Sequence, residues 1–279
     1  MVNPKMNRAP IDLLLANLHR LSGFDFSAYN RKHILRRLEL RMKLENCADL
    51  SQLLGLLLQS PALLNNILED FSIQVTSLFR DAEFFQEFRN KIVPILRELP
   101  EIYIWHAGCS TGEEAYSMAI LLTEEGLLEK THIYATDFNE KAVEQARRGA
   151  FPLQHLTDYA ENYRLAGGKE TLSAYMDTDG ESAYFHSALS QAIFFEQHNL
   201  VTDGSFHEFH VILCRNVCIY FNTSLQKHVQ ELFYNSLYPG GLLCLGDQES
   251  LISLESNQHF KEFGVTNNIY SKLEHPKRE

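Results

Sequence analysis

The sequence lacks several patterns that would assign it quickly to a class of protein. No apolar run reaches the ~18 residues that a membrane-spanning helix requires, and no basic start precedes a long apolar core near the N-terminus. Its five cysteines are scattered, and no pair has the Cys-x-x-Cys spacing of a metal or redox site. We therefore expect a cytoplasmic protein with free, buried thiols, without membrane insertion and without a bound metal.

An excess of basic residues is also missing. The 279 residues carry a net charge of −11, whereas proteins that bind nucleic acids need a basic surface to neutralise phosphates. With 45% hydrophobic and 22% charged residues, the composition is typical of a globular protein that forms one large domain or two ordinary ones. We expect no nucleic-acid partner, although one local segment is basic.

The stretch from Ile102 to Ser117 has the pattern of a buried strand, a turn and the start of a helix. Gly108 and Gly112 allow backbone conformations that let a ligand lie close to the main chain, and the first N–H groups of the helix would face that ligand. About 25 residues later, a second apolar run ends in Asp137. This layout predicts a nucleoside-binding βαβ unit, in which the acid accepts hydrogen bonds from the ribose.

The turn departs from the Gly-x-Gly-x-x-Gly pattern of dinucleotide-binding proteins. It contains two glycines, and Glu113 and Glu114 follow the second one directly. Two carboxylates would repel a pyrophosphate but suit a ligand with an amine or a sulfonium, and S-adenosylmethionine carries both. The alternative is an ordinary crossover in which the acids stabilise the helix N-terminus by about 0.3–1 kcal/mol.

The first 71 residues have the apolar spacing of helices, and one segment among them is strongly basic. Residues 31–43 contain six Lys or Arg and one acid. On a helical wheel we place the basic side chains opposite the apolar face: Lys32, Arg36, Arg37, Arg41 and Lys43. A solvated polar face is one interpretation. We favour a docking surface for an acidic partner, because like charges four residues apart are unfavourable in a helix.

A linker at 72–88 follows this helical region. Gln74, Thr76 and Arg80 are polar positions in an otherwise apolar and aromatic run. Thr76 or Ser77 could cap the next helix while Arg80 pairs with an acid that follows it. Alternatively, the linker lies across the mouth of the nucleoside site, where Arg80 would bind a carboxylate.

The rest of the chain alternates apolar strands with helical segments, which predicts a mostly parallel α/β sheet covered on both faces. We count five or six strands and expect a small antiparallel β insertion at about 165–191, around an Asp-x-Asp-Gly turn. The later elements expected are a helix from Leu225 to Leu237, a strand from Leu242 to Leu245 and a closing segment at 263–270. The expected organisation is a helical domain at 1–71, the linker, and an α/β domain at 89–279.

Four motifs occur in a fixed order: Thr76-Ser-Leu-Phe-Arg-Asp81, Gly108-Cys-Ser-Thr-Gly-Glu-Glu-Ala-Tyr-Ser117, Asn199-Leu200 and Cys214-Arg-Asn-Val-Cys-Ile-Tyr-Phe221. In order and spacing they resemble the CheR family of chemoreceptor protein-glutamate O-methyltransferases. The likeness covers nearly the whole chain, which carries Ala115 and Gln74 where the family often has Pro and Asn. The resemblance implies a Rossmann-like methyltransferase fold, S-adenosylmethionine as the methyl donor with S-adenosylhomocysteine as its product, and glutamate side chains of a chemoreceptor cytoplasmic domain as acceptors. We expect a monomer.

The resemblance also implies roles for single residues. Arg80 and Tyr220 would lie close to the transferred methyl group, Glu114 would bind the cofactor's amino group, and Asp137 would hold the ribose. The remaining positions implied for the cofactor pocket are Gln74, Thr76, Gly108, Asn199, Leu200, Arg215 and Asn216, with Asn199 and Leu200 beside the adenine. Acidic receptor helices would dock on Lys32, Arg36, Arg37 and Arg41, and a receptor tail could add a strand to the insertion.

Two other functions fit parts of this pattern. The protein could be a sensor that binds S-adenosylmethionine and docks on a partner without turnover. It could also be a methyltransferase for a small molecule or a nucleic acid, which the acidic balance and the basic helix disfavour.

Overall fold

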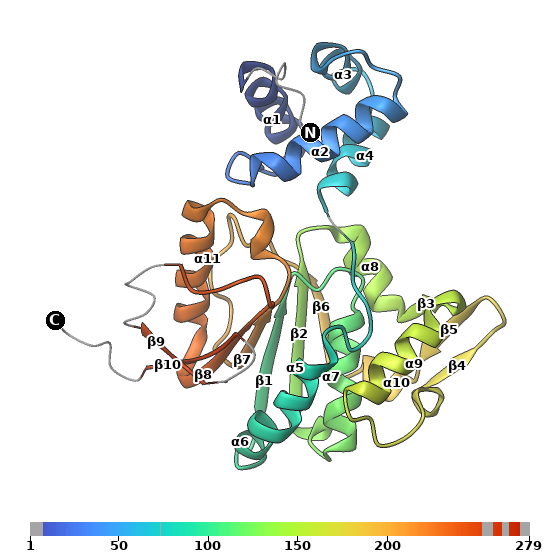
Figure 1. Cartoon of the computed structure of the whole chain (residues 1–279), viewed down its shortest axis with the longest axis vertical. Coiled ribbons are helices and arrows are strands. Elements are labelled where there is room, and N and C mark those ends of the chain that lie inside the picture. Colours follow the sequence, from blue (N-terminus) through green and yellow to red (C-terminus); the bar gives the residue numbers. More distant parts are fainter. Residues whose placement is uncertain (1–7, 73, 253–258, 264–267, 274–279) are drawn as a thin grey trace. The chain divides into compact units, whose positions relative to one another are not determined.

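The computed structural model describes residues 8–72, 74–252, 259–263 and 268–273 (Figure 1). The chain divides into two compact units. Of the described residues, the first unit, which we call the helical unit, comprises those up to 72 together with 218–228. The second, the sheet unit, comprises 74–217 and the described residues from 229 onward. No helix within the described ranges is both long and apolar enough to cross a bilayer.

The helical unit is built on α1 (Arg8–Ser22), α2 (Arg31–Leu44), α3 (Leu50–Leu57) and α4 (Pro61–Phe71). The side chains of Asn30, Asp49 and Ser60 accept hydrogen bonds from backbone N–H groups in the first turns of α2, α3 and α4. Leucines and isoleucines at helical spacing form its core. The expected helical N-terminal region is confirmed.

Arg41 does not lie on the exposed face of α2, and our placement of it there is wrong. Its side chain is 12% exposed and pairs with Asp70 of α4, with Nε 2.7 Å from Oδ2 and Nη2 2.9 Å from Oδ1. Position 41 follows the buried Ile34 by seven residues and the buried Leu38 by three, so all three share one face of the helix. Arg41 therefore joins two helices instead of facing solvent.

The segment 218–228 belongs to the helical unit although it lies far along the chain. It begins with a 3₁₀ turn, η5 (Cys218–Tyr220). Tyr29 and Phe221 form an isolated antiparallel bridge, with their ring centroids 5.0 Å apart, and the Asn30 N–H donates to the Tyr220 carbonyl at 2.7 Å. The sequence predicted a place for Tyr220 after a strand but not these contacts.

Within the described part of the chain, seven strands form the main sheet of the sheet unit, in the order β6-β2-β1-β7-β8-β10-β9. They are β1 (Ile102–Ala107), β2 (Thr131–Asp137), β6 (Ile193–Gln197), β7 (Phe209–Cys214), β8 (Leu237–Leu245), β9 (Phe260–Glu262) and β10 (Ile269–Lys272). The first five in this order run parallel, and β10 and β9 pair antiparallel. The predicted mostly parallel α/β sheet is confirmed, with more strands than the five or six expected.

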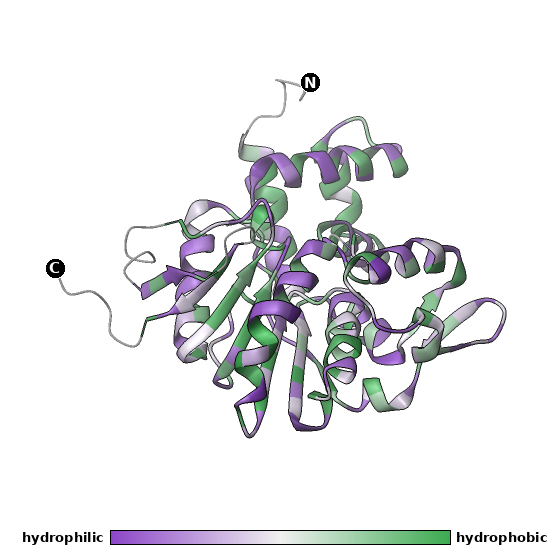
Figure 2. Cartoon of the chain, turned by 60° about the horizontal axis from the view of Figure 1, so that its bottom comes forward, coloured by the Kyte–Doolittle hydropathy of each residue, from purple (hydrophilic) through white to green (hydrophobic). Residues whose placement is uncertain are grey.

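Short and long helices precede and connect these strands. They are α5 (Ala82–Glu87), a π-helical turn η1 (Phe88–Ile92), α6 (Val93–Arg97), α7 (Glu113–Glu124), η2 (Leu128–Lys130), α8 (Glu140–Arg148), η3 (Leu153–His155), α9 (Leu156–Leu165), η4 (Leu172–Tyr175), α10 (Ser187–Ser190) and α11 (Thr223–Ser236). Figure 2 shows the central strands as largely hydrophobic, whereas most helices carry both hydrophobic and hydrophilic stripes. This pattern is typical of a parallel sheet that is buried between helices.

The C-terminal part differs from our expectation in detail. α11 ends one residue earlier than expected, and β8 begins at Leu237 instead of Leu242, so the Pro-Gly-Gly run lies within the strand. The register between β7 and β8 shifts between Phe209 and Val211, which is a bulge that accommodates the glycines. Of the closing segment expected at 263–270, residues 264–267 lie outside the described residues.

The small antiparallel insertion is confirmed, with one more strand than expected. β4 (Met176–Thr178) and β5 (Ser182–Phe185) form the predicted hairpin, and β3 (Ala150–Pro152) pairs with β5 to give the order β3-β5-β4. β3 precedes the expected range because Gly149, with φ of 59°, ends α8 and turns the chain back at once. In Figure 1 this sheet lies at the end of the sheet unit away from β9 and β10.

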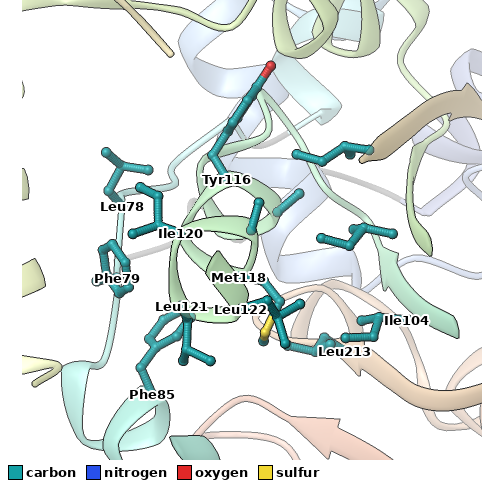
Figure 3. Packing of buried hydrophobic residues seen from close by; sticks show 14 of the residues in the cluster. Leu78, Phe79, Phe85, Ile104, Tyr116, Met118, Ile120, Leu121, Leu122 and Leu213 are labelled. Atoms are coloured by element: carbon teal, nitrogen blue, oxygen red, sulfur yellow. The ribbon is translucent and has the colours of Figure 1, made fainter. Parts of the chain in front are cut away.

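Helix α7 is buried on more than one side. Figure 3 shows Leu78, Phe79 and Phe85 on one side of it and the strand residues Ile104 and Leu213 on the other. The linker is therefore part of the core of the sheet unit. This packing fixes the start of α7, where the glycine turn ends, against both the sheet and the linker.

A buried carboxylate at the C-terminal end of α7 holds three other segments. Glu124, whose side chain is 2% exposed, forms an ion pair with Arg89 and accepts hydrogen bonds from the hydroxyls of Tyr163 and Tyr175 and from the Lys169 N–H at 2.9 Å. Replacing Glu124 with alanine leaves the buried Arg89 with Glu125 as its remaining counterion and removes the carboxylate that accepts from Tyr163 and Tyr175. We expect the variant to lose about 3–5 kcal/mol of unfolding free energy in urea titrations.

The exposed ion pair between Glu161 and Arg164 supplies the matched control. Glu161→Ala should leave the unfolding free energy close to the wild-type value, because exposed pairs contribute little. Equal effects of the two substitutions would contradict a structural role for the Glu124 network.

Candidate functional site

The site lies at the carboxyl ends of the central parallel strands. From β1 the chain moves outward through β2 to β6, then returns to β7 on the other side of β1 and continues to β8. The strand order thus reverses between β1 and β7, and ligands of open α/β sheets bind at such a point. Gly108 follows β1, Asp137 ends β2 and Arg215 follows β7, so three predicted residues meet this edge.

The turn after β1 is tightly coiled. Gly108, Ser110 and Gly112 have φ of 83°, 51° and 94°, and a side chain on Gly108 would place its Cβ 2.5 Å from Cγ2 of Val217. Glycine is therefore required at 108 by the packing of the protein itself, a reason that the sequence did not reveal. The Ser110 hydroxyl is buried, and among the described residues it has no hydrogen-bond partner, which is typical of a place that a polar ligand completes.

Asp137 connects β2 to this turn. Its Oδ2 accepts the Ser110 N–H at 2.9 Å and its Oδ1 accepts the Asn139 N–H at 3.0 Å. Burial raises the pKa of Asp137 above its ordinary value, although these backbone N–H groups act in the opposite direction. A carboxylate oxygen can accept more than one hydrogen bond, so Asp137 retains capacity for a hydroxyl of a ligand.

The two acids at the start of α7 have different environments. Glu113 is buried and accepts the Thr111 hydroxyl at 2.7 Å, and burial raises its pKa. Glu114 is 20% exposed and contacts His106 Nδ1 at 2.9 Å and Arg215 Nη1 at 3.0 Å. Burial alone would raise the pKa of Glu114, but the hydrogen bond from His106 and the charge of Arg215 outweigh it and lower the pKa. Glu114 is thus an ionised carboxylate, whereas Glu113 is part of the core.

The loop that carries Arg80 meets the same residues. Arg215 Nη2 lies 2.8 Å from Asp81 Oδ2, and its Nη1 lies 3.4 Å from the Arg80 carbonyl oxygen. The half-exposed Arg80 side chain donates to the Val75 carbonyl at 2.9 Å. Asp81 precedes α5 without a side-chain cap bond, so Thr76 does not cap this helix. The structure therefore excludes the first interpretation of the linker, in which Thr76 caps the next helix and Arg80 pairs with Asp81.

The remaining predicted positions of the sheet unit are spread around the edge. The His198 N–H donates to the Asp137 carbonyl at 3.1 Å, which places Asn199 and Leu200 next to the end of β2. Asn199 Oδ1 accepts the Val201 N–H at 3.0 Å, and Leu200 is buried.

Two more predicted positions lie in irregular backbone. Gln74 is exposed and Thr76 is half-exposed, in the stretch between α4 and α5. The structure gives both residues a place in the linker, and their contact with a cofactor stays a prediction.

Sequence reasoning missed the residue that fixes the turn after β7. Asn216 has φ of 62°, and the Glu249 carboxylate accepts the N–H groups of Asn216 at 2.7 Å and Val217 at 2.9 Å. Glu249 is buried and lies 33 positions beyond Asn216, so no local sequence pattern predicts its contact with this turn. Asp81, which lies within a motif that we quoted, was missed because its partner Arg215 is 134 positions away. His106 was also missed, although it lies only eight positions before its partner Glu114.

Tyr220 and the basic residues belong to the helical unit. The Tyr220 ring meets the ring of His33 edge-on, with centroids 5.1 Å apart. Lys32 and Arg36 are exposed and Arg37 is partly exposed, so three of the four predicted docking residues face solvent.

Comparisons with known proteins cover both units. The family model described as "CheR methyltransferase, all-alpha domain" matches residues 9–72, and that described as "CheR methyltransferase, SAM binding domain" matches residues 74–269. A protein of Pseudomonas putida named "Putative methyltransferase Cher3" is 39% identical over 98% of this chain and 100% of its own length. The "Chemotaxis protein methyltransferase" of Listeria innocua is 26% identical over 83% of this chain and 86% of its own length.

Proposed function

Because the chain belongs to the CheR methyltransferase family, we propose that it transfers the methyl group of S-adenosylmethionine to glutamate side chains of chemoreceptor cytoplasmic helices. The products are glutamyl methyl esters and S-adenosylhomocysteine. One observation carries the proposal: at the point where the strand order reverses, Arg215 contacts both the ionised Glu114 and the loop of Arg80. Asp137 accepts the Ser110 N–H in the turn that leads into the same helix.

The residues at this edge fit S-adenosylmethionine. Glu114 offers a negative charge to the cofactor's amino group, and Asp137 offers carboxylate oxygens to its ribose hydroxyls. The buried Ser110 hydroxyl supplies a further polar group in the same turn. Asn199 and Leu200 would lie by the adenine, and Gln74, Thr76 and Asn216 would complete the pocket. A dinucleotide would bring a pyrophosphate to the same turn, where the charge of Glu114 would repel it.

The reaction requires little acid–base catalysis from the protein. The cofactor supplies an electrophilic methyl group on a positively charged sulfur. An ionised glutamate is already a nucleophile at neutral pH, so the chain's own residues must align it and exclude water. Such alignment contributes ~7–11 kcal/mol to lowering a barrier. Arg80 would hold one oxygen of the substrate carboxylate by a charge-assisted hydrogen bond, and Tyr220 keeps the role, close to the methyl group, that the resemblance implies.

Transfer of a labelled methyl group to receptor fragments tests this function. We expect incorporation into a chemoreceptor cytoplasmic fragment that alkaline treatment releases, because methyl esters hydrolyse in base. Binding of S-adenosylhomocysteine without any incorporation would favour the sensor instead. Base-stable label on nucleic acid or on a small molecule would favour the other alternative.

The exposed basic side chains of α2 are the proposed docking surface for the acidic receptor helices. We expect the double charge reversal Arg36→Glu and Arg37→Glu to raise KM for a receptor fragment at low salt, with less effect at high salt, where surface charges are screened. The affinity for S-adenosylhomocysteine should stay unchanged. The measurement is the methylation rate at several fragment concentrations and two salt concentrations.

A matched variant changes the net charge equally elsewhere. Arg148 and Arg164 are exposed on α8 and α9 of the sheet unit, and their reversal to glutamate should leave KM near the wild-type value. Equal increases of KM in both double variants would point to net charge alone and remove the docking role from α2.

A receptor tail that adds a strand would use the edge strand β4 of the small sheet.

A further inference from the structure

A single buried guanidinium links three elements of the site. The Arg215 side chain is 1% exposed and follows β7. It lies 3.0 Å from Glu114 of α7, 2.8 Å from Asp81 and 3.4 Å from the Arg80 carbonyl oxygen, and its Cζ lies 4.0 Å from the centre of the Phe84 ring in α5. The Nη atoms of Arg215 are thus occupied by protein groups, whereas its buried Nε has no hydrogen-bond partner among the described residues. The direct cofactor contact that the resemblance implies for Arg215 stays a prediction.

The loop that Arg215 holds is conformationally demanding. Phe79 and Asp81 have φ of 50° and 57°, in the left-handed region that residues other than glycine rarely adopt. Arg80 lies between them. Such conformations persist when surrounding contacts fix them, and they gather at functional sites.

Contacts on each side of Arg80 fix this loop. Before it, the Phe79 N–H donates to Ser117 Oγ at 2.8 Å, and Asn162 Nδ2 donates to the Leu78 carbonyl at 3.0 Å. After it, Arg215 binds both the Asp81 carboxylate and the Arg80 carbonyl. Arg215 is therefore the contact that joins the Arg80 loop to Glu114.

The arrangement suits arginine and not lysine. A guanidinium can donate from separate nitrogens to two carboxylates that belong to different elements, whereas an ammonium is a single point charge. Removing the cation would leave Glu114 and Asp81 as close, partly buried like charges. The segment after Arg80 would then lose its link to Glu114, although the Phe79 N–H would still bind Ser117 of α7.

We propose that Arg215 is a positioning residue for methyl transfer: it holds the Arg80 loop and the Glu114 carboxylate in one fixed relation. This inference rests on the proposed function. Arg215 acts on the reaction through Arg80, which orients the acceptor carboxylate, and through Glu114, which orients the donor. Its loss therefore lowers the rate of the step more than it lowers the affinity for either ligand.

The test is a double-variant cycle on the full chain, with methylation of a receptor fragment as the readout. Arg215→Lys should lower kcat by about 100-fold, because small misplacements of reacting groups have effects of this size. KM for the fragment and the affinity for S-adenosylhomocysteine should change by only a few-fold. In the background of Arg80→Ala, the same substitution should lower kcat by much less, because the group that Arg215 positions is already absent.

Arg89 provides a matched control for the loss of a buried guanidinium. It also bridges two carboxylates, Glu124 and Glu125, and its side chain is 8% exposed. Arg89→Lys should lower the unfolding midpoint and leave kcat near the wild-type value. If Arg215→Lys proves too unstable to assay, Asp81→Asn loosens the same tie from a side chain that is 31% exposed, and it should give the same non-additive pattern.

Several outcomes would overturn the inference. An equal fall of kcat in the wild-type and Arg80→Ala backgrounds would make the role of Arg215 general stability. A loss of S-adenosylhomocysteine affinity with unchanged kcat would make it a cofactor contact. Failure of the proposed function is a different result, since the wild-type protein would then not methylate the fragment at all.

Discussion

The Arg80→Ala variant is expected to lose about 10²- to 10³-fold in kcat, the usual cost of removing one group that stabilises charge at a reacting centre. Arg80 would hold the acceptor carboxylate while the methyl group moves to it. Its side chain donates to the Val75 carbonyl from a half-exposed position, so the truncation removes little packing. The unfolding free energy should therefore change by no more than about 0.5 kcal/mol.

Single-turnover kinetics with saturating cofactor measure this effect directly. Arg80→Lys serves as the graded control: it keeps the charge but loses the planar fork of donors, so its kcat should fall between the wild type and the alanine variant. An alanine variant with wild-type kcat would remove Arg80 from the reaction and leave it as a loop residue only.

Asp137→Ala is expected to weaken binding of S-adenosylhomocysteine by about 1.5–3 kcal/mol, as for the loss of a hydrogen bond to a charged group. The effect has two sources. The ribose would lose its acceptor, and the Ser110 N–H would lose the carboxylate that fixes the turn. Titration calorimetry with S-adenosylhomocysteine measures the affinity, and an unchanged affinity would place Asp137 outside the site.

One further variant tests these two sources of the lost affinity, and a second serves as a control. Asp137→Asn keeps one carbonyl oxygen for a backbone N–H and should weaken binding less than alanine does. Thr136→Val changes the neighbouring buried residue, whose hydroxyl accepts the Trp105 indole N–H at 2.9 Å. This variant should lower stability by about 1–3 kcal/mol with unchanged affinity, because an indole N–H is left unsatisfied away from the ligand.

The sequence could predict the features that depend on local patterns of residues. The strand, turn and helix from Ile102 to Ser117 follow from apolar runs and two glycines, and Asp137 follows from the end of the next apolar run. The antiparallel hairpin around Asp179 and Gly180 likewise follows from its turn residues. Each of these needs only the few residues that surround it.

The features that could not be predicted depend on distant partners. Arg215 meets Asp81, which lies 134 positions earlier, and Glu249 fixes Asn216 from 33 positions away. No spacing within one segment encodes such pairs. Arg41 is a different case, because its place on the buried face of α2 follows from helical periodicity and our wheel assigned it to the wrong side.

The different roles of the adjacent acids Glu113 and Glu114 also could not be predicted from the sequence. Sequence alone gave them one joint role, a negative end for a cationic ligand. The structure buries Glu113 against Thr111 and ionises Glu114 beside Arg215. Which of two neighbouring carboxylates faces the site depends on the groups that the fold brings to each.

Position-resolved mass spectrometry of a receptor fragment after incubation with S-adenosylmethionine tests the central claim most directly. The account predicts a methyl group on specific glutamates of an acidic helix, lost on mild alkaline treatment and absent from a fragment in which those glutamates are changed to glutamine. The matched assay with Arg80→Ala should show the same sites at a much lower rate. A wild-type protein that binds S-adenosylhomocysteine but leaves every glutamate of the fragment unmethylated would contradict it.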